Sequence, residues 1–281
     1  MISATLYSDP ACPWAYSESP ALRVLEWRYG DQLEWRLVLI GLTESASQYQ
    51  MRGYTPLRGA LGQLRFRRYG MPFSPAPKDR ISATARACRA VVAARLVEPG
   101  SEFAVFRALQ LANFTSPLLL DDDAQLAEVV GERIASMLDS DEVTEAYDRD
   151  RAESRTAGGS AAELQGKTAS TDGPVRFTAP SIVFEANSQR LVAGGFQPVE
   201  AYDVLVTNLD PGLHREPPPP TPAPLLERFS SGLTSQEVAL LMTDGNDAPD
   251  REGAEAALLE LVAAGHAVRE PLGDDALWKP A

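Results

Sequence analysis

The sequence predicts an α/β protein that carries a helical insertion and a small second domain. Three observations support this fold class: residues 3–39 show strand, helix and strand patterns in succession, residues 80–165 are dominated by helical patterns, and strand patterns return after residue 177. A length of 281 residues fits about two domains, at roughly 150 residues each. With 44% hydrophobic residues, the chain can also bury a substantial core.

The first 42 residues predict a β-loop-α-β unit. Residues 3–8 have the pattern of a short strand, and the helix predicted over residues 14–29 ends at Gly30. Residues 33–39 begin with alternating apolar and polar side chains and end with apolar ones, which is typical of a strand within a sheet.

A helical insertion is predicted over about residues 43–170. Prolines interrupt residues 43–79, so no regular element is predicted there. Helices are predicted over residues 81–96, 103–112 and 141–162, and a further helix begins at residues 121–123. Cys88 lies on the apolar face of the first of these helices, where a buried and inert thiol is common.

Strand patterns return in residues 177–185 and 189–193, with Asn187-Ser188 as the hairpin turn between them. Pro180 lies inside the first of these two strand patterns. A helix is predicted over residues 198–209, with Pro198 in its first turn.

A proline-rich linker is predicted over residues 213–224, because six of the eight residues from 217 to 224 are proline. Such a run favours a polyproline II spacer of roughly 25 Å, at ~3.1 Å per residue. The linker divides the chain into a domain of residues 1–212 and a smaller domain of residues 225–281.

The small domain has the sequence features of two helices followed by a hairpin. Thr234 and Glu237 have the spacing of a capping box, a second helix is predicted over residues 252–264, and a hairpin turn is predicted at Gly273. This order resembles a winged-helix module. The domain carries a net charge of −7, which argues against DNA binding and favours docking to a protein or to the rest of the chain.

The charge is unevenly distributed along the chain. The formal net charge is −13, but residues 1–97 carry +6 and residues 98–163 carry −10. Nucleic acid is therefore not an expected partner. No apolar run approaches the ~18 residues of a membrane span, and the N-terminus lacks the features of a signal peptide, so we expect a cytoplasmic protein that does not enter the membrane.

The chain contains only two cysteines and two histidines. This count excludes a disulfide-stapled scaffold and a histidine-rich metal site, and no metal ligands are predicted. No histidine lies within residues 1–213, so a cysteine–histidine pair in the larger domain is excluded as well.

The most informative segment is Asp9-Pro-Ala-Cys12-Pro13-Trp14-Ala-Tyr16, because it places a cysteine between a strand and a helix. Unpaired N–H groups and the dipole at a helix N-terminus favour negative charge, so the pKa of Cys12 is expected to be lowered. Pro13 at the first helical position costs no needed donor. The alternative interpretation of Cys12 is a buried structural cysteine. Asp9 is expected to cap the loop rather than to act as an acid.

Cys-Pro-Trp-Ala resembles the Cys-Pro-Trp-Cys motif of the DsbA-like thioredoxin-fold family. The order β-α-β, helical insertion, proline-preceded hairpin and helix is also similar to that family, over about residues 1–212. The cytoplasmic branch includes thiol oxidoreductases, kappa-class glutathione transferases and 2-hydroxychromene-2-carboxylate isomerases. The resemblance implies a thioredoxin-like fold and a cis Ala179–Pro180 bond facing Cys12, with the alternative that Pro180 only begins an edge strand.

The chain departs from this family at Ala15, which stands where the second motif cysteine would be. A dithiol cycle within the motif is therefore impossible, and Cys88 is the only other thiol. We expect Cys12 to act as the nucleophile and Tyr16 to donate a hydrogen bond to it, or else to pack at the helix start.

The remaining candidates are expected to bind the substrate thiol. The residues expected to line the site are Pro13, Trp14, Ala179 and Ser181. Arg65 and Arg68 are expected to lie in a glycine- and proline-rich loop and to bind an anionic thiol there. The alternative for the basic segment is an ordinary solvated face. No tightly bound cofactor is expected, and mycothiol or glutathione is the expected co-substrate.

Three functions remain open. The first is a monothiol thiol-disulfide oxidoreductase that works through Cys12 on a small thiol or disulfide. The second is a thiol-dependent transferase or isomerase of the kappa or 2-hydroxychromene-2-carboxylate type. The third is a non-catalytic interaction module that binds a protein through residues 225–281. A homodimer is compatible with each of these functions.

Overall fold

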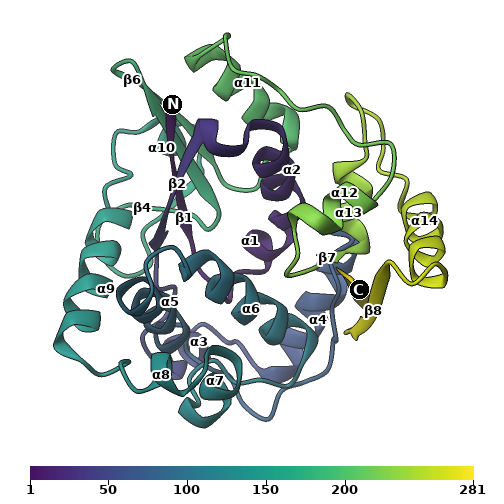
Figure 1. The fold of residues 1–281 in the computed structure, drawn as a ribbon. Coiled ribbons are helices and arrows are strands. Elements are labelled where there is room, and N and C mark those ends of the chain that lie inside the picture. Colours follow the sequence, from purple (N-terminus) through teal and green to yellow (C-terminus); the bar gives the residue numbers. More distant parts are fainter.

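The computed structural model describes residues 1–281 and is built on a four-stranded sheet with the strand order β2-β1-β5-β6 (Figure 1). Strand β1 (Ile2–Ser8) pairs in parallel with β2 (Leu33–Leu39) and antiparallel with β5 (Ser181–Ala186), which forms a hairpin with β6 (Gln189–Gly194). Nearly every residue of β1 is buried, as expected for a central strand. The mixed α/β fold class is therefore confirmed.

The connection between β1 and β2 is broken into two helices, α1 (Pro13–Ser17) and α2 (Ser19–Tyr29). The prediction of one helix over residues 14–29 was wrong at Glu18, where the chain passes from the first helix to the second. Pro20, two residues after Glu18, lacks the N–H that a continuous helix would need at that position. Helix α2 packs against α11 (Val199–Leu209).

The insertion between β2 and β5 is mainly helical, as predicted. Its helices are α3 (Ala46–Met51), α4 (Pro56–Phe66), α5 (Ala85–Val97), α6 (Glu102–Thr115), α7 (Asp123–Val130), α8 (Glu132–Ala135), α9 (Asp141–Ser154) and α10 (Ala161–Leu164). The short strands β3 (Thr168–Ala169) and β4 (Arg176–Phe177) and the 3-10 turns η1 (Gly30–Gln32) and η2 (Arg67–Tyr69) complete the larger part of the chain. The two helices predicted from residues 121 and 141 are each interrupted, the first at Gly131, which has a φ of 82°.

Residues 43–79, for which the sequence predicted no regular element, contain α3, α4 and η2. Thr55 caps α4 by accepting a hydrogen bond from the Arg58 N–H, and Pro56 occupies the first turn, where a proline is well tolerated. Pro56 therefore begins a helix and does not interrupt one.

The C-terminal residues form the helices α12 (Ala223–Arg228), α13 (Ser235–Leu241) and α14 (Arg251–Ala263) and the strands β7 (Leu233–Thr234), β8 (Ala267–Leu272) and β9 (Asp275–Pro280). The strands form a separate sheet with the order β7-β9-β8. The predicted capping box at Thr234 and Glu237 is confirmed, and Gly273 lies in the hairpin turn. The description of residues 225–281 as winged-helix-like stays a prediction.

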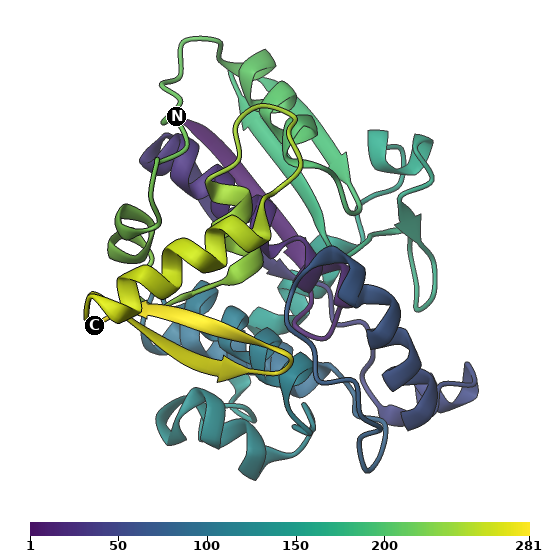
Figure 2. The same cartoon turned by 90° about the vertical axis from the view of Figure 1, so that its right-hand side faces the viewer.

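The C-terminal part is not held away from the rest of the chain by a free spacer. The proline-rich segment lies along the larger part, with the Glu216 N–H donating to Arg28 O and the Trp27 indole donating to Pro217 O. The Arg107 guanidinium pairs with Glu237 in a buried contact, and one hydrophobic cluster of 45 residues includes side chains from both parts. Figure 2 shows the C-terminal hairpin and helices packed over the front of the molecule.

None of the helices is both long enough and apolar enough to span a membrane.

Candidate active site

The site is formed where the loop after β1 meets the segment before β5. Cys12 has extended backbone geometry and directly precedes α1, and its N–H donates to Asp9 O at 3.1 Å. The Ala179–Pro180 peptide bond is cis, as expected. The Cys12 thiol donates a hydrogen bond to Ala179 O at 3.1 Å, so the structure brings the predicted cysteine and the predicted cis-proline segment together.

The expected lowering of the Cys12 pKa is not found. Burial of the thiol, which is only 6% exposed, raises its pKa to about 12, and the negative charge of Asp9 acts in the same direction. The N–H groups of Ala15 and Trp14 and the charge of Arg176 oppose this shift but are outweighed. Helix α1 has only five residues, so its dipole is too short to offset the loss of water.

The raised pKa has a consequence for reactivity. With a pKa of about 12, only about one thiol in 10⁵ is ionised at pH 7. A less acidic thiol is intrinsically more nucleophilic, with a Brønsted slope of about 0.4–0.5, which restores part of the loss. Together these effects make the resting thiol about 100-fold slower at pH 7 than a free cysteine.

Asp9 caps the loop before Cys12, as predicted. Its carboxylate is fully buried and accepts hydrogen bonds from the N–H groups of Ala11 and Leu42, both at 2.8 Å, and from the Thr84 hydroxyl at 2.9 Å. Burial raises the pKa of this carboxyl, and the three donors oppose that shift. The network connects the loop before Cys12 to α5.

Cys88 is buried on α5, and its thiol lies 3.5 Å from Asp9 Oδ2. Both cysteines are free thiols. Cys88 is 0% exposed and packs in the main hydrophobic cluster, apart from the smaller cluster that holds Cys12, so it is a poor candidate for resolving a disulfide at Cys12. Burial and the charge of Asp9 also raise its pKa well above its ordinary value.

Tyr16 does not donate to Cys12, so that expectation was wrong. Its hydroxyl donates to Pro72 O at 2.8 Å, and its ring stacks on Phe114, with a centroid distance of 4.6 Å. Tyr16, Met71, Phe73 and Phe114 form a separate buried cluster, named the Tyr16 cluster below. The α1 backbone turns this side chain inward, away from the sulfur.

Trp14 is exposed beside the site, as expected, with 40% of its surface accessible. It contacts the rings of Phe66, Tyr69 and Phe196 at centroid distances of 4.8, 5.5 and 5.6 Å. These four aromatic residues are named the Trp14 cluster below. Sequence reasoning missed three of them, because they come from α4, η2 and the segment after β6, and no spacing in the sequence connects those segments.

Arg65 lies on α4 and Arg68 lies on η2. The prediction that both arginines lie in a glycine- and proline-rich loop was therefore wrong. Arg68 donates to the Tyr69 hydroxyl at 2.8 Å, and its guanidinium lies 4.9 Å from the centre of that ring. Arg68 is therefore in contact with the Trp14 cluster. Arg65 is exposed and forms neither an ion pair nor a hydrogen bond.

Ser181 is fully buried and is not free to bind a ligand through its hydroxyl, contrary to expectation. The hydroxyl donates to Thr178 O at 2.7 Å and accepts from the Gly195 N–H at 3.2 Å. These bonds hold the turn that carries Ala179 and Pro180. Pro13 is half-buried at the start of α1, next to the sulfur-bearing residue.

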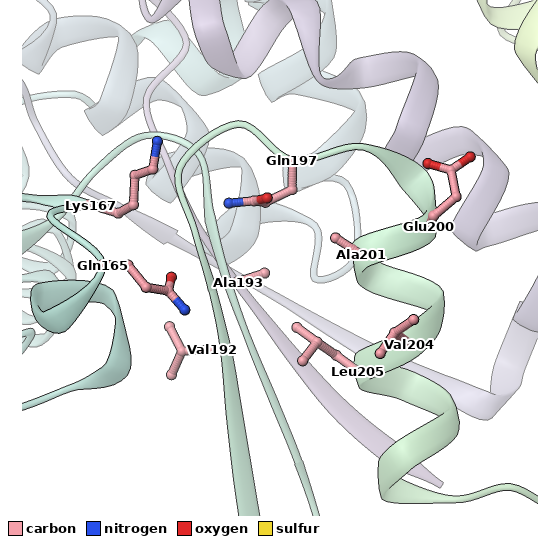
Figure 3. Close-up of a pocket in the computed structure, with 9 residues that line it drawn as sticks. All are labelled: Gln165, Lys167, Val192, Ala193, Gln197, Glu200, Ala201, Val204 and Leu205. Atoms are coloured by element: carbon pink, nitrogen blue, oxygen red, sulfur yellow. The ribbon is translucent and has the colours of Figure 1, made fainter. Parts of the chain in front are cut away.

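One cavity of substantial size lies away from the thiol. It has a volume of about 550 Å³ and lies between β6 and α11, with Lys167, Gln197 and Glu200 among its polar residues (Figure 3). Cys12 is not among the residues that line it. The candidate site is therefore defined by the cysteine and the cis-proline segment, and not by this cavity.

No protein-family model and no curated protein sequence matches the chain. Solved structures match it at low identity. The cytosolic disulfide reductase DsbM from Pseudomonas aeruginosa, in a structure with GSH, is 20% identical, with a TM-score of 0.51, covering 74% of this chain and 98% of that one. A probable DsbA oxidoreductase from Streptomyces coelicolor is also 20% identical, with a TM-score of 0.52, covering 75% of this chain and 91% of that one. The chain therefore has the thioredoxin-like fold of DsbA-like proteins.

Proposed function

We propose that this chain is a thiol-disulfide oxidoreductase that works through Cys12 alone. The observation that carries the proposal is the 3.1 Å contact between the Cys12 thiol and the carbonyl of the residue before the cis-proline. The Cys12 sulfur therefore lies beside the backbone of Ala179 and Pro180, where a substrate disulfide could bind next to it. The N–H groups of Trp14 and Ala15 favour the thiolate once it forms.

The exchange needs no group that the chain lacks except a second thiol. The Cys12 thiol loses its proton to solvent, and the thiolate attacks one sulfur of a disulfide. A Cys12–sulfur bond forms while the substrate S–S bond breaks, and the departing thiolate takes up a proton. Because Ala15 replaces the second cysteine and Cys88 lies against Asp9, a thiol from solution must release Cys12.

We propose a low-molecular-weight thiol such as glutathione or mycothiol for this release, used as a co-substrate and not as a bound cofactor. Support comes from the absence of a resolving thiol in the motif and from the DsbM structure, which was solved with GSH. A free-thiol mechanism fits a reducing compartment, which is consistent with cytoplasmic localisation.

Intact-mass measurement after incubation with oxidised glutathione tests the proposal. We expect one adduct, mapped to Cys12, which added reduced thiol removes. The Cys88→Ser variant should form the same adduct and the Cys12→Ser variant should form none. An adduct that persists in the Cys12→Ser variant, or no adduct between pH 7 and pH 10, would contradict the proposal.

A second function is favoured by the burial of Cys12, which is only 6% exposed and whose pKa is raised by that burial. A thiol that stays protonated at neutral pH can donate a hydrogen bond to the sulfur of a bound thiol, as a serine hydroxyl can. In that case the chain is a thiol-dependent transferase or isomerase and Cys12 never forms a disulfide. Glutathione-dependent turnover that survives fully in the Cys12→Ser variant would support this second function over the first.

A further inference from the structure

The segment next to the site exposes an unusual amount of apolar surface. Of the twelve large hydrophobic side chains that are exposed, five lie within residues 51–64. Leu57, Leu61 and Leu64 are spaced four and three residues apart, so they lie on one side of α4. Figure 2 shows α4, in dark blue, at the edge of the molecule and away from the central sheet. An apolar stripe on a surface helix is normally covered by another element.

The same segment also carries positive charge that the chain does not neutralise. Residues 45–78 contain six basic residues and no Asp or Glu. Of the 23 arginines, 15 form ion pairs with a carboxylate, but only Arg67 does so among the five in this segment. The chain as a whole has a net charge of −13, so an excess of positive charge within residues 45–78 is unusual for this protein.

This surface adjoins the thiol. Helix α4 packs against α1, the helix that Cys12 precedes, and its last residue, Phe66, contacts Trp14. Tyr49, at the other end of the segment, is close enough to Cys12 and Asp9 for their charges to raise its pKa, although burial is the main cause. A molecule held on α4 would therefore lie beside the route to the sulfur.

We propose that the surface formed by Leu57, Leu61, Leu64, Arg58 and Arg65 on α4 and by Arg68 on the adjoining turn η2 docks an acidic and apolar polypeptide segment whose disulfide Cys12 attacks. This surface is named the α4 face below. The inference rests on the proposed thiol-disulfide function and specifies its substrate as a polypeptide.

The charge of the α4 face decides between a foreign polypeptide and a second copy of the chain. A symmetric dimer through this face would bring Arg58, Arg65 and Arg68 of one subunit against the same residues of the other. Like charges across an interface cost free energy, and residues 45–78 contain no carboxylate that could relieve the repulsion. Acidic residues on a separate polypeptide satisfy the unpaired arginines, while its apolar side chains cover the leucines.

The reaction on such a substrate is the exchange already described. The Cys12 thiolate forms a bond to the polypeptide sulfur, the polypeptide's S–S bond breaks, and the partner sulfur leaves as a thiol. The α4 face makes no bond to the reacting atoms and acts only by holding the polypeptide near Cys12.

Two peptides test the proposal. Each has one cysteine activated as a 2-thiopyridyl disulfide and flanked by leucines, with glutamates in one peptide and lysines in the other. Release of 2-thiopyridone reports the rate of attack by Cys12, measured in the Cys88→Ser background. We expect the acidic peptide to react at least tenfold faster than the basic one at low salt. Because exposed charges are screened, this ratio should shrink at about 1 M salt, where the Debye length is about 3 Å.

Variants assign that preference to the α4 face. In Arg58→Gln/Arg65→Gln, the ratio of the acidic to the basic peptide rate should fall to less than a third of its original value. In Leu61→Ser/Leu64→Ser, the ratio of the acidic peptide rate to the rate with 2,2′-dithiodipyridine should fall by the same factor, because both peptides carry leucines and the small compound carries none. The ratio is the correct readout because a general change in Cys12 reactivity cancels from it. Leu259→Ser is the matched control, since Leu259 is 53% exposed on α14, and it should keep the full ratio.

The outcomes separate the docking proposal from the proposed function. If Cys12 fails to react even with the small uncharged 2,2′-dithiodipyridine, the proposed function fails and the docking proposal falls with it. If Cys12 reacts with that compound but both peptides react equally fast, only the docking proposal is overturned. Sedimentation that shows a dimer which Leu61→Ser/Leu64→Ser dissociates would also overturn it, because a second copy would then cover the face.

Discussion

The short helix α1 carries two aromatic residues with opposite surroundings. Tyr16 is 1% exposed, and the C-terminal part of the chain contacts its cluster. There the Phe73 N–H donates a hydrogen bond to Asp274 Oδ1, and the Asp274 N–H donates one to Phe73 O. Trp14, two residues earlier, is 40% exposed, and no residue of the C-terminal part stacks on its ring.

The different surroundings of Tyr16 and Trp14 distinguish a part of the molecule that stabilises the fold from a surface that is free to bind a ligand. The C-terminal part of the chain packs against the Tyr16 cluster. Charged side chains between the C-terminal part and the larger part are paired, as Arg107 is with Glu237. Beside the Trp14 cluster the chain leaves leucines uncovered and arginines unpaired. We infer that the Tyr16 side is structural and that the Trp14 side is the binding side, and the following predictions test that division.

The largest expected effect comes from removing a phenylalanine on each side. Phe73 is fully buried in the Tyr16 cluster, so Phe73→Ala should lower the free energy of unfolding by about 3–5 kcal/mol. Phe196 in the Trp14 cluster is only partly buried and is not part of the Tyr16 cluster, so Phe196→Ala should cost less than half as much. Urea unfolding measures both values. Equal losses would remove the proposed difference between the two sides.

A slightly smaller loss is expected from breaking the ion pair between Arg107 and Glu237. Glu237→Gln keeps the shape and capping capacity of the side chain but leaves the Arg107 charge buried without a counterion. The free energy of unfolding should fall by about 3 kcal/mol or more. Arg36→Gln is the control, because the Arg36–Glu153 pair is exposed and should contribute less than about 1 kcal/mol.

Glu18 differs from Glu237 because its carboxyl group is buried without a positively charged partner. Its Oε2 accepts from the Gln197 N–H at 3.2 Å, its Oε1 has no partner, and burial raises its pKa to about 8. The folded state therefore binds a proton that the unfolded state releases above about pH 4.5, so stability should be lost as the pH rises through about 8.

The expected loss for the unmodified protein is about 1–3 kcal/mol between pH 6 and pH 9, and Glu18→Gln should abolish it. Unfolding free energies measured at both pH values test this. A protein that becomes more stable toward pH 9, or a Glu18→Gln variant with the same slope as the unmodified protein, would be inconsistent with a protonated Glu18.

The smallest stability effect is expected for Tyr16→Phe. The variant removes one hydrogen bond to Pro72 O and should cost about 1–2 kcal/mol. Because Tyr16 does not contact the sulfur, the pH dependence of Cys12 alkylation should stay unchanged. A shift in that profile would restore the direct role that the sequence suggested for Tyr16.

Local patterns in the sequence predicted most of the fold and the centre of the site. The β-α-β start, the helical insertion, the hairpin, the Thr234 capping box and the pairing of Cys12 with a cis Pro180 all depend on short-range signals or on the family resemblance. Helix breaks were harder to predict, because a proline such as Pro56 can begin a helix as readily as interrupt one.

The ionisation of Cys12 could not be predicted in this way. A position before a helix suggested a lowered pKa, but the length of that helix and the burial of the thiol depend on how distant segments cover it. The same is true of the Trp14 cluster and of Glu18, whose surroundings come from segments separated by 50 or more residues in the chain.

The most direct test of the account is the pH dependence of Cys12 alkylation by iodoacetamide in the Cys88→Ser variant. Because burial raises the pKa of Cys12 to about 12, the rate should be slower than that of free cysteine at pH 7 and should rise about tenfold per pH unit up to at least pH 10. A rate that is fast at pH 7 and levels off below pH 8 would show an acidic thiol and would contradict the structure of the site described above.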